Sequence, residues 1–150
     1  MELTITTMTK AHIPALAALE QACFSTPWSE AALSEELGNP LAIFLVAERK
    51  GIAVGYAGMQ VVGDEGFFTN VAVSPACRRQ GIADALLAAL VQIGKDRGFY
   101  RLTLEVRVSN APAISLYEKY GFVKEGIRPR FYRDPAEHAA IYSLYNQKED

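Results

Sequence analysis

The sequence predicts an α+β fold in which a mixed, mostly antiparallel sheet is flanked by helices. Three short apolar runs follow one another in the first half of the chain with glycine-containing turns between them, which is typical of neighbouring strands. Two segments with helical spacing come later, each directly after a strand-like run. Hydrophobic residues make up 50% of the 150 residues, enough for one core, so we expect a single domain over residues 1–150.

The N-terminal part is predicted to contain one strand and two helices. Residues 3–6 favour a strand. Thr9 is a favoured cap for a helix that runs to about Ala22, with Pro14 disturbing its early turns. Ser29 opens a second, short helix, which the Gly-Asn-Pro sequence at 38–40 ends.

Three consecutive strands are predicted next, over residues 43–48, 53–61 and 67–73. The Lys-Gly pair at 50–51 and the Gly-Asp-Glu-Gly sequence at 63–66 are turn signals. These short connections predict antiparallel pairing of the three strands.

The most informative stretch is the end of the third of these strands and the segment that follows it. The strand stops at Pro75 and leads into a basic loop, after which apolar residues recur with helical spacing at Ile82, Leu86, Ala89, Leu90 and Ile93. The first N–H groups of such a helix have no partner inside it, and the positive end of the helix dipole lies there. Gly81 allows close approach to the backbone, and Arg78 and Arg79 add cations, so we predict a phosphate or pyrophosphate site.

Two common nucleotide motifs do not fit this loop. A Walker loop needs a Lys-Ser/Thr pair after its second glycine, and none follows Gly81. A dinucleotide fingerprint needs three glycines, and the loop has only Gly81.

The second half continues as helix, strand, helix and strands. Residues 101–106 alternate, which places Glu105 on the face opposite the apolar residues. Asn110 is a favoured cap for a short helix that Gly121 ends; a strand follows, and residues 140–145 form a last strand. The predicted sheet therefore has six to seven strands with about four helices.

Two motifs in this order resemble the signatures of the GCN5-related N-acetyltransferase (GNAT) family. The first is Arg78-x-x-Gly81-x-Ala83 after a buried strand, and the second is Leu-Tyr-x-x-x-Gly-Phe at 116–122 behind the Asn110 cap. The resemblance implies the GNAT fold, a splay between the strands at 70–73 and 101–106, and acetyl-CoA as co-substrate. On this basis the cofactor-binding residues are expected to be Val71, Ala72, Val73, Arg78, Arg79, Gln80, Gly81, Ile82, Ala83 and Asn110.

Three further segments resemble one group of this family, whose members acetylate the N-terminal alanine of a small-subunit ribosomal protein, the eighteenth of that set. These are Phe-Ser-Thr-Pro-Trp-Ser at 24–29, Leu-Glu-Val-Arg at 104–107 and Arg-Phe-Tyr at 130–132. The chain departs from the pattern at Pro129 and over residues 133–138. The implied partner is a ribosomal-protein N-terminal peptide, with Phe24, Pro27, Trp28, Arg130 and Tyr132 as the substrate-binding residues.

The resemblance also assigns the catalytic residues. Glu105 is the implied proton acceptor, although by residue type alone it reads as a solvated strand residue. Tyr117 is the implied proton donor to the sulfur, although by spacing alone it reads as a core aromatic. The backbone of Val71 and Val73 is expected to contact the thioester carbonyl and the pantetheine arm, since Pro75 ends any ladder there.

Composition excludes other classes of function. The 15 Lys and Arg residues against 17 Asp and Glu residues give a net charge of −2, which argues against direct nucleic-acid binding. The sequence has no membrane-length apolar run and no signal-like N-terminus, so we expect a cytoplasmic protein, and a monomer as the simplest state. Two cysteines and two histidines show no ligand spacing, so we expect no metal.

Three hypotheses remain open at this point. The first is an acetyl-CoA-dependent N-terminal acetyltransferase of a ribosomal protein, acting by direct attack without a covalent enzyme intermediate. The second is an acetylase of a small amine or of lysine side chains on the same scaffold, and the third is a non-catalytic acyl-CoA-binding module. The presence of both Glu105 and Tyr117 argues against the third.

Overall fold

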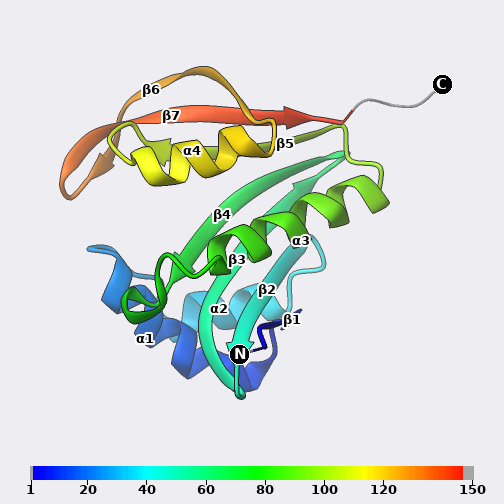
Figure 1. The fold of residues 1–150 in the computed structure, drawn as a ribbon, viewed down its shortest axis with the longest axis vertical. Coiled ribbons are helices and arrows are strands. Elements are labelled where there is room, and N and C mark those ends of the chain that lie inside the picture. Colours follow the sequence, from blue (N-terminus) through cyan, green and yellow to red (C-terminus); the bar gives the residue numbers. More distant parts are fainter. Residues whose placement is uncertain (1, 147–150) are drawn as a thin grey trace.

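A computed structural model describes residues 2–146, which form one seven-stranded sheet and four α-helices (Figure 1). The strands are β1 (Thr4–Thr7), β2 (Ala42–Arg49), β3 (Ile52–Val62), β4 (Glu65–Val73), β5 (Arg101–Arg107), β6 (Val123–Arg133) and β7 (Ala136–Tyr145). The helices are α1 (Ile13–Cys23), α2 (Glu30–Leu37), α3 (Ile82–Asp96) and α4 (Ala111–Lys119), with short 3-10 turns η1 (Lys10–His12) and η2 (Pro75–Cys77). The predicted α+β class is confirmed.

The strand order in the sheet is β1-β2-β3-β4-β5-β7-β6. Neighbours are antiparallel except β4 and β5, which run parallel and pair only over Glu65–Phe67 and Arg101–Thr103. Beyond these three pairs the two strands diverge, which confirms the implied splay. Figure 1 shows β5, β6, β7 and α4 parting from the rest of the molecule on one side.

The sheet has a hydrophobic core on each face. On one face α3 buries Ile82, Leu86 and Leu90 against alternate residues of β5, of which Leu102 is fully buried. On the other face α1 and α2 contribute Leu16 and Leu33 to a second cluster with Tyr56 and Phe44. The two helical layers fix both faces of β4, while one of its edges stays open where β5 departs.

Most predicted boundaries lie close to the observed ones, and two do not. Ser29 caps α2 by accepting a hydrogen bond from the N–H of Ala32 at 3.1 Å, as predicted. The first helix was predicted from Thr9, but Thr9 caps the 3-10 turn and α1 begins at Ile13. The last strand begins at Ala136 and not at residue 140, because β6 and β7 form a hairpin whose polar tip carries no apolar alternation.

No helix in residues 2–146 combines the length and the apolar character that crossing a membrane requires.

Candidate functional site

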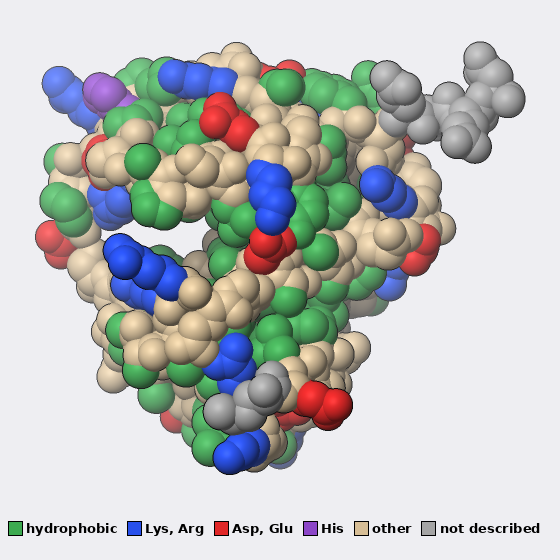
Figure 2. All heavy atoms as spheres, in the orientation of Figure 1, with side chains coloured by type: hydrophobic (Ala, Val, Ile, Leu, Met, Phe, Trp, Pro, Cys, Tyr) green, Lys and Arg blue, Asp and Glu red, His purple; other side chains and the backbone are tan. Residues whose placement is uncertain are grey.

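A cavity of about 440 Å³ occupies the gap between β4 and β5. It is lined by the end of α1, the segment after it, the middle of β4, the end of β5, the start of α4 and the β6–β7 turn. Figure 2 shows a hollow on the side where the two parts of the molecule separate, with Lys and Arg side chains on both of its rims.

The open edge of β4 offers backbone groups to this gap. The N–H of Ser74 donates to the carbonyl of Val54 at 2.8 Å, so by antiparallel alternation Ala72 also bonds to β3. The N–H groups of Val71 and Val73 consequently face away from β3, toward the gap. The Val73 carbonyl accepts a hydrogen bond from the Cys23 thiol at 3.4 Å.

The segment after β4 leads to the start of α3, and its last residue, Gly81, has a left-handed conformation. Gly81 is the N-cap of α3 with φ of +80°, and no side chain caps the helix. The first N–H groups of α3 therefore lack the partners that interior positions have. A Cβ at Gly81 would meet nothing within 4 Å, so the approach to these N–H groups is open.

The side chains of residues 78–82 contact different parts of the molecule, whereas the free backbone N–H groups lie together at the start of α3. Arg78 and Arg79 are exposed, and Arg79 has φ of +64°. The Arg78 guanidinium lies 3.6 Å from the Cys23 sulfur, and Gln80 accepts a hydrogen bond from Arg49. Ile82 is buried, so only its backbone can face a ligand.

Glu105 extends from β5 into the cavity, on the face opposite the buried Leu104 and Val106. Its Oε2 is buried and has no hydrogen-bond partner. The Arg128 Nε lies 3.4 Å from that oxygen, an ion-pair distance without hydrogen-bond alignment. Within residues 2–146, Glu105 Oε2 thus has an ion-pair partner but no hydrogen-bond donor.

Tyr117 and Asn110 reach the cavity from α4. Burial, and then the nearby Tyr132, raises the pKa of Tyr117 to about 12, so its phenol keeps its proton at neutral pH. The Asn110 side chain caps α4 by accepting from the N–H of Ala113 at 3.3 Å, as predicted. The capping oxygen is occupied, while the rest of the side chain lines the cavity.

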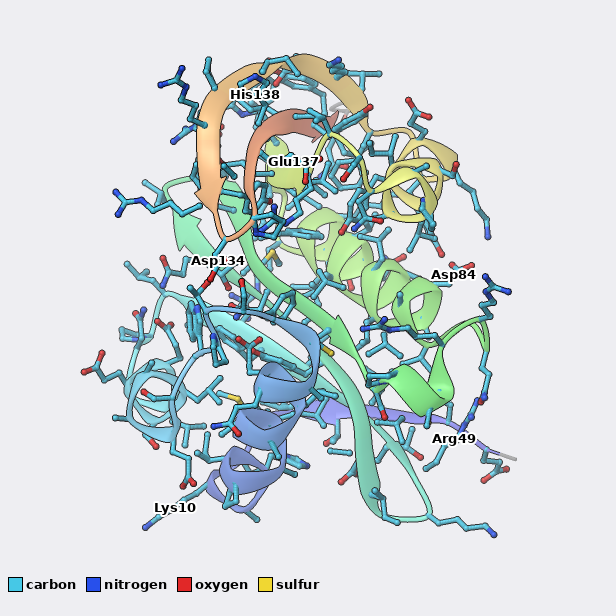
Figure 3. The ribbon with its side chains drawn as sticks, turned by 90° about the vertical axis from the view of Figure 1, so that its left-hand side faces the viewer. Lys10, Arg49, Asp84, Asp134, Glu137 and His138 are labelled. Atoms are coloured by element: carbon cyan, nitrogen blue, oxygen red, sulfur yellow. The ribbon has the colours of Figure 1, made fainter. Side chains whose placement is uncertain are left out.

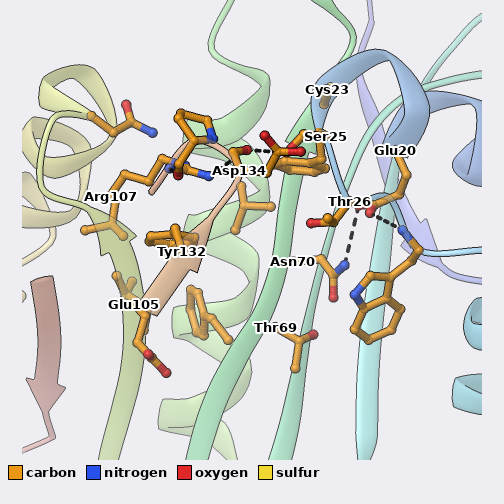
Figure 4. A pocket seen from close by; sticks show the side chains of 18 of the residues that line it. Glu20, Cys23, Ser25, Thr26, Thr69, Asn70, Glu105, Arg107, Tyr132 and Asp134 are labelled. Atoms are coloured by element: carbon orange, nitrogen blue, oxygen red, sulfur yellow. Dashed lines mark hydrogen bonds between the residues drawn. The ribbon is translucent and has the colours of Figure 1, made fainter. Parts of the chain in front are cut away.

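A buried hydrogen-bond cluster around Glu20 forms the opposite wall, and the sequence reasoning missed it. Glu20 is 1% exposed and accepts from the N–H of Trp28 at 2.8 Å, the hydroxyl of Tyr56 at 2.7 Å and the side-chain amide of Asn70 at 3.4 Å. Figure 4 shows the contacts with Trp28 and Asn70. Burial, with the Glu20 carboxylate next, raises the pKa of Tyr56 well above its usual value. The missed signal was a glutamate four residues after Leu16, on the apolar face of α1.

The β6–β7 hairpin closes one end of the cavity. Arg107 donates to the carbonyl of Pro135 at 2.8 Å and pairs with Glu137 at 3.2 Å, and its guanidinium lies 4.3 Å from the ring centre of Tyr132. The Ser25 hydroxyl donates to the carbonyl of Asp134. Figure 3 shows Asp134 at the hairpin tip above the end of α1. The hairpin is thereby tied to β5 and to the segment after α1.

The structure brings together three of the five predicted substrate-binding residues. Phe24, Trp28 and Tyr132 line the cavity. Pro27 is exposed and does not line it. Arg130 is also outside it, in a left-handed conformation with φ of +53° and its N–H donating to His138.

Among residues 2–146, no group of three or more His, Cys, Asp or Glu side chains is placed to hold a metal ion.

Comparison with known proteins gives consistent matches. Residues 13–122 match the acetyltransferase (GNAT) family. The [ribosomal protein bS18]-alanine N-acetyltransferase of Escherichia coli is 38% identical over 143 residues, 94% of this chain and 96% of the relative. The Salmonella typhimurium protein of the same name is 38% identical over 136 residues, covering 90% of each chain.

Solved structures show the same likeness. The crystal structure of the ribosomal-protein-S18-alanine N-acetyltransferase from Escherichia coli matches with a TM-score of 0.91 at 36% identity, over 99% of this chain and 97% of the other. Ard1 from Thermoplasma volcanium matches with a TM-score of 0.89 at 24% identity, over 99% of this chain and 100% of that one, which is a likeness of fold.

Proposed function

The chain belongs to the acetyltransferase (GNAT) family, and we propose from that premise that it uses acetyl-CoA to acetylate the N-terminal alanine of ribosomal protein bS18. The substrate comes from relatives that carry that name and are 38% identical over nearly their whole length. A ribosomal-protein substrate agrees with the cytoplasmic location that the sequence predicts.

The observation that supports the proposal is the gap between β4 and β5, which Glu105 and Tyr117 line and which lies beside the end of β4 that leads to the start of α3. Bound acetyl-CoA would supply an acetyl group already activated as a thioester. The unpartnered N–H groups at the start of α3 would hold its diphosphate, and the open space beside Gly81 fits that group. The N–H groups of Val71 and Val73 would bind the pantetheine arm and the thioester carbonyl.

Glu105 would take the proton that the amine loses as it becomes a nucleophile. Its buried oxygen, which has no hydrogen-bond donor, supports this role, since it can accept a proton directly or through one water molecule. Tyr117 would donate a proton to the departing sulfur, because its pKa of about 12 keeps the phenol protonated at the pH of the reaction. The new bond joins the amine nitrogen to the acetyl carbon as the carbon–sulfur bond breaks, and no covalent enzyme intermediate is needed.

The peptide would enter beside Phe24, Trp28 and Tyr132, where the β6–β7 turn and the segment after α1 form the rim of the cavity. Aromatic side chains are common anchors for peptides. Pro27 and Arg130 stay predictions for the outer part of that path.

A competition between two amines in one peptide tests the proposal. Purified protein and acetyl-CoA are mixed with a peptide that has the N-terminal sequence of bS18 and an internal lysine, and fragmentation mass spectrometry locates the acetyl group. We expect acetylation of the α-amine, and none of a matched peptide with a blocked N-terminus. Acetylation of the lysine, or of small amines only, would favour the second hypothesis, and CoA binding without turnover on any amine would favour the non-catalytic one.

A further inference from the structure

Three buried side-chain polar atoms in the described residues lack a hydrogen-bond partner, namely Arg49 Nε, Asn70 Oδ1 and Glu105 Oε2. The last two are oxygens, and both residues line the same cavity. Asn70 Oδ1 has no donor, and Glu105 Oε2 has only the Arg128 guanidinium, 3.4 Å away without hydrogen-bond alignment. A buried acceptor without a donor costs about 1–3 kcal/mol, so two such side chains lining one cavity point to a ligand that brings donors.

The orientation of the Asn70 amide is set by Glu20. Asn70 is 7% exposed, and its nitrogen donates to Glu20 Oε2 at 3.4 Å. The same carboxylate accepts from Tyr56 and from the N–H of Trp28, so it presents only acceptors to its surroundings. The amide nitrogen must therefore face Glu20, which leaves Oδ1 as a fixed acceptor in the cavity wall.

Asn70 and Glu105 face the same side of the sheet across the splay. Asn70 points toward α1, where it meets Glu20. Leu104 and Val106 pack into the core on the α3 and α4 side, so Glu105 between them points to the opposite side, which is also that of α1. Both residues line the cavity, and Figure 4 shows Glu105 and Asn70 on opposite sides of it.

We propose that Asn70 Oδ1 and Glu105 hold the α-amino group of the substrate between them. The neutral amine has two N–H bonds and one lone pair. One N–H is directed to Glu105, which has already passed the proton of the ammonium form to water and takes this second proton as the nitrogen bonds to the acetyl carbon. The other N–H is directed to Asn70. Asn70 is unchanged by the reaction, and Glu20 is a positioning residue that fixes its amide. This inference rests on the proposed function, because it assumes an amine substrate in this cavity.

Two acceptors for one nitrogen make the site selective for primary amines. A peptide that begins with N-methylalanine has only one N–H on its neutral nitrogen, so it can satisfy Glu105 or Asn70 but not both. The wild-type protein should therefore discriminate against the methylated peptide more strongly than a variant in which Asn70 no longer accepts.

The test compares wild type with Asn70→Leu, which keeps the size of the side chain and removes its acceptor, on alanine- and N-methylalanine-starting peptides. We expect kcat/KM for the alanine peptide to fall about ten- to a hundredfold in the variant, with little change in the Kd for CoA. The preference for the unmethylated peptide should shrink by about tenfold. An unchanged preference in the variant would overturn the role of Asn70.

Two further variants separate this role from a structural one. Asn70→Ala serves if Asn70→Leu does not fold, and it should show the same loss of preference, because alanine also removes the acceptor. Glu20→Gln keeps the shape of the cluster but can also donate, so it lets the Asn70 amide turn; its preference should shrink while CoA binding stays. If the wild-type protein acetylates a different primary amine, the proposed substrate is wrong. The role of Asn70 is then decided by the preference for that amine over its N-methyl form, compared between wild type and variant.

Discussion

The two walls of the cavity are built in different ways. The proposed cofactor wall consists of β4 residues 71–73, the loop 74–81 and the start of α3; Val71 lines the cavity, and the rest continues beyond it. It offers mainly backbone N–H groups from one continuous stretch. The proposed substrate wall consists of Glu20, Phe24, Trp28, Asn70, Glu105 and Tyr132, and it presents side chains from four helices and strands and from the segment after α1. A backbone site tolerates changes of side chain but not of conformation, whereas a side-chain site depends on every partner in its hydrogen-bond cluster.

This difference predicts that variants of the two walls have separable effects. Changes in the cofactor wall should alter CoA affinity, and changes in the substrate wall should alter amine acetylation at unchanged CoA affinity. The variants below test that separation, from the largest expected effect to the smallest.

Glu105→Gln should give the largest effect, because the amide cannot take the proton from the amine. We expect turnover to fall by about a hundredfold or more, most strongly at lower pH where few amines are neutral, with the Kd for CoA unchanged. Steady-state kinetics across pH measure this. Glu65→Gln is a matched control on β4, outside the cavity at the paired end of β4 and β5, and should keep full turnover. Equal turnover of Glu105→Gln and wild type at every pH would remove Glu105 as the base.

Tyr117→Phe should slow transfer by about tenfold to a hundredfold, less than Glu105→Gln, because a thiolate can leave without a full proton transfer. Tyr117 donates only while protonated, so its contribution is present below its pKa of about 12 and lost above it. Wild-type turnover should therefore not decline through about pH 10, the usual pKa of tyrosine. A decline with an apparent pKa near 10 that disappears in Tyr117→Phe would show that burial does not protect the proton.

Gly81→Val should weaken CoA binding by about tenfold, because a branched residue disfavours the left-handed conformation and covers the adjacent N–H groups. Gly51→Val is the matched control, since Gly51 has φ of +77° and equally open surroundings but lies in the β2–β3 turn. Both variants should lose about 1–2 kcal/mol of unfolding free energy, and only Gly81→Val should bind CoA less tightly. Equal CoA affinities in calorimetric titrations would contradict the cofactor wall.

Asp84→Asn should give the smallest effect. Asp84 lies in the first turn of α3 and accepts from Lys119 at 2.7 Å and from Tyr120, so it ties α3 to α4; Lys119 first and Tyr120 next lower its pKa. Because the pKa of Asp84 is lower in the folded state than in the unfolded state, its carboxylate stabilises the fold at pH values above the unfolded-state pKa. That stabilisation is lost as the pH falls through the folded-state pKa. We expect a loss below about 1 kcal/mol at neutral pH, because the pair is partly exposed.

Denaturant unfolding at neutral and acidic pH checks this prediction, with Asp96→Asn at the other end of α3 as control. The difference between wild type and Asp84→Asn should vanish in acid, where the wild-type carboxyl is also neutral. A difference that persists in acid would mean that the charge of Asp84 is not its cause.

The same contrast explains how much of the site the sequence could predict. The loop from Pro75 to Gly81 was predictable because strand end, glycine and helix start are local signals, and the structure has the left-handed glycine at the N-cap where the motif required it. The splay between β4 and β5 was not derivable from local pattern and came from the family resemblance. The Glu20 cluster was missed because two of its three partners, Tyr56 and Asn70, lie 36 and 50 residues away in the chain.

The β6–β7 hairpin was predicted least well for a related reason. Its tip carries polar residues around Pro135. The first residues of β7 are a strand because they pair with β6, and their sequence has no alternation of apolar and polar residues that would predict one. The contacts that close the cavity also depend on the pairing of β6 with β7. Examples are the ion pair of Arg107 with Glu137 and the cation–π contact of Arg107 with Tyr132.

A crystal structure of the protein with bound CoA tests the central claim most directly. The account predicts that the diphosphate oxygens accept hydrogen bonds from the N–H groups that follow Gly81, with the pantetheine arm between β4 and β5 and the sulfur near Tyr117. A diphosphate bound away from the start of α3, or a thiol directed outside the gap, would contradict it.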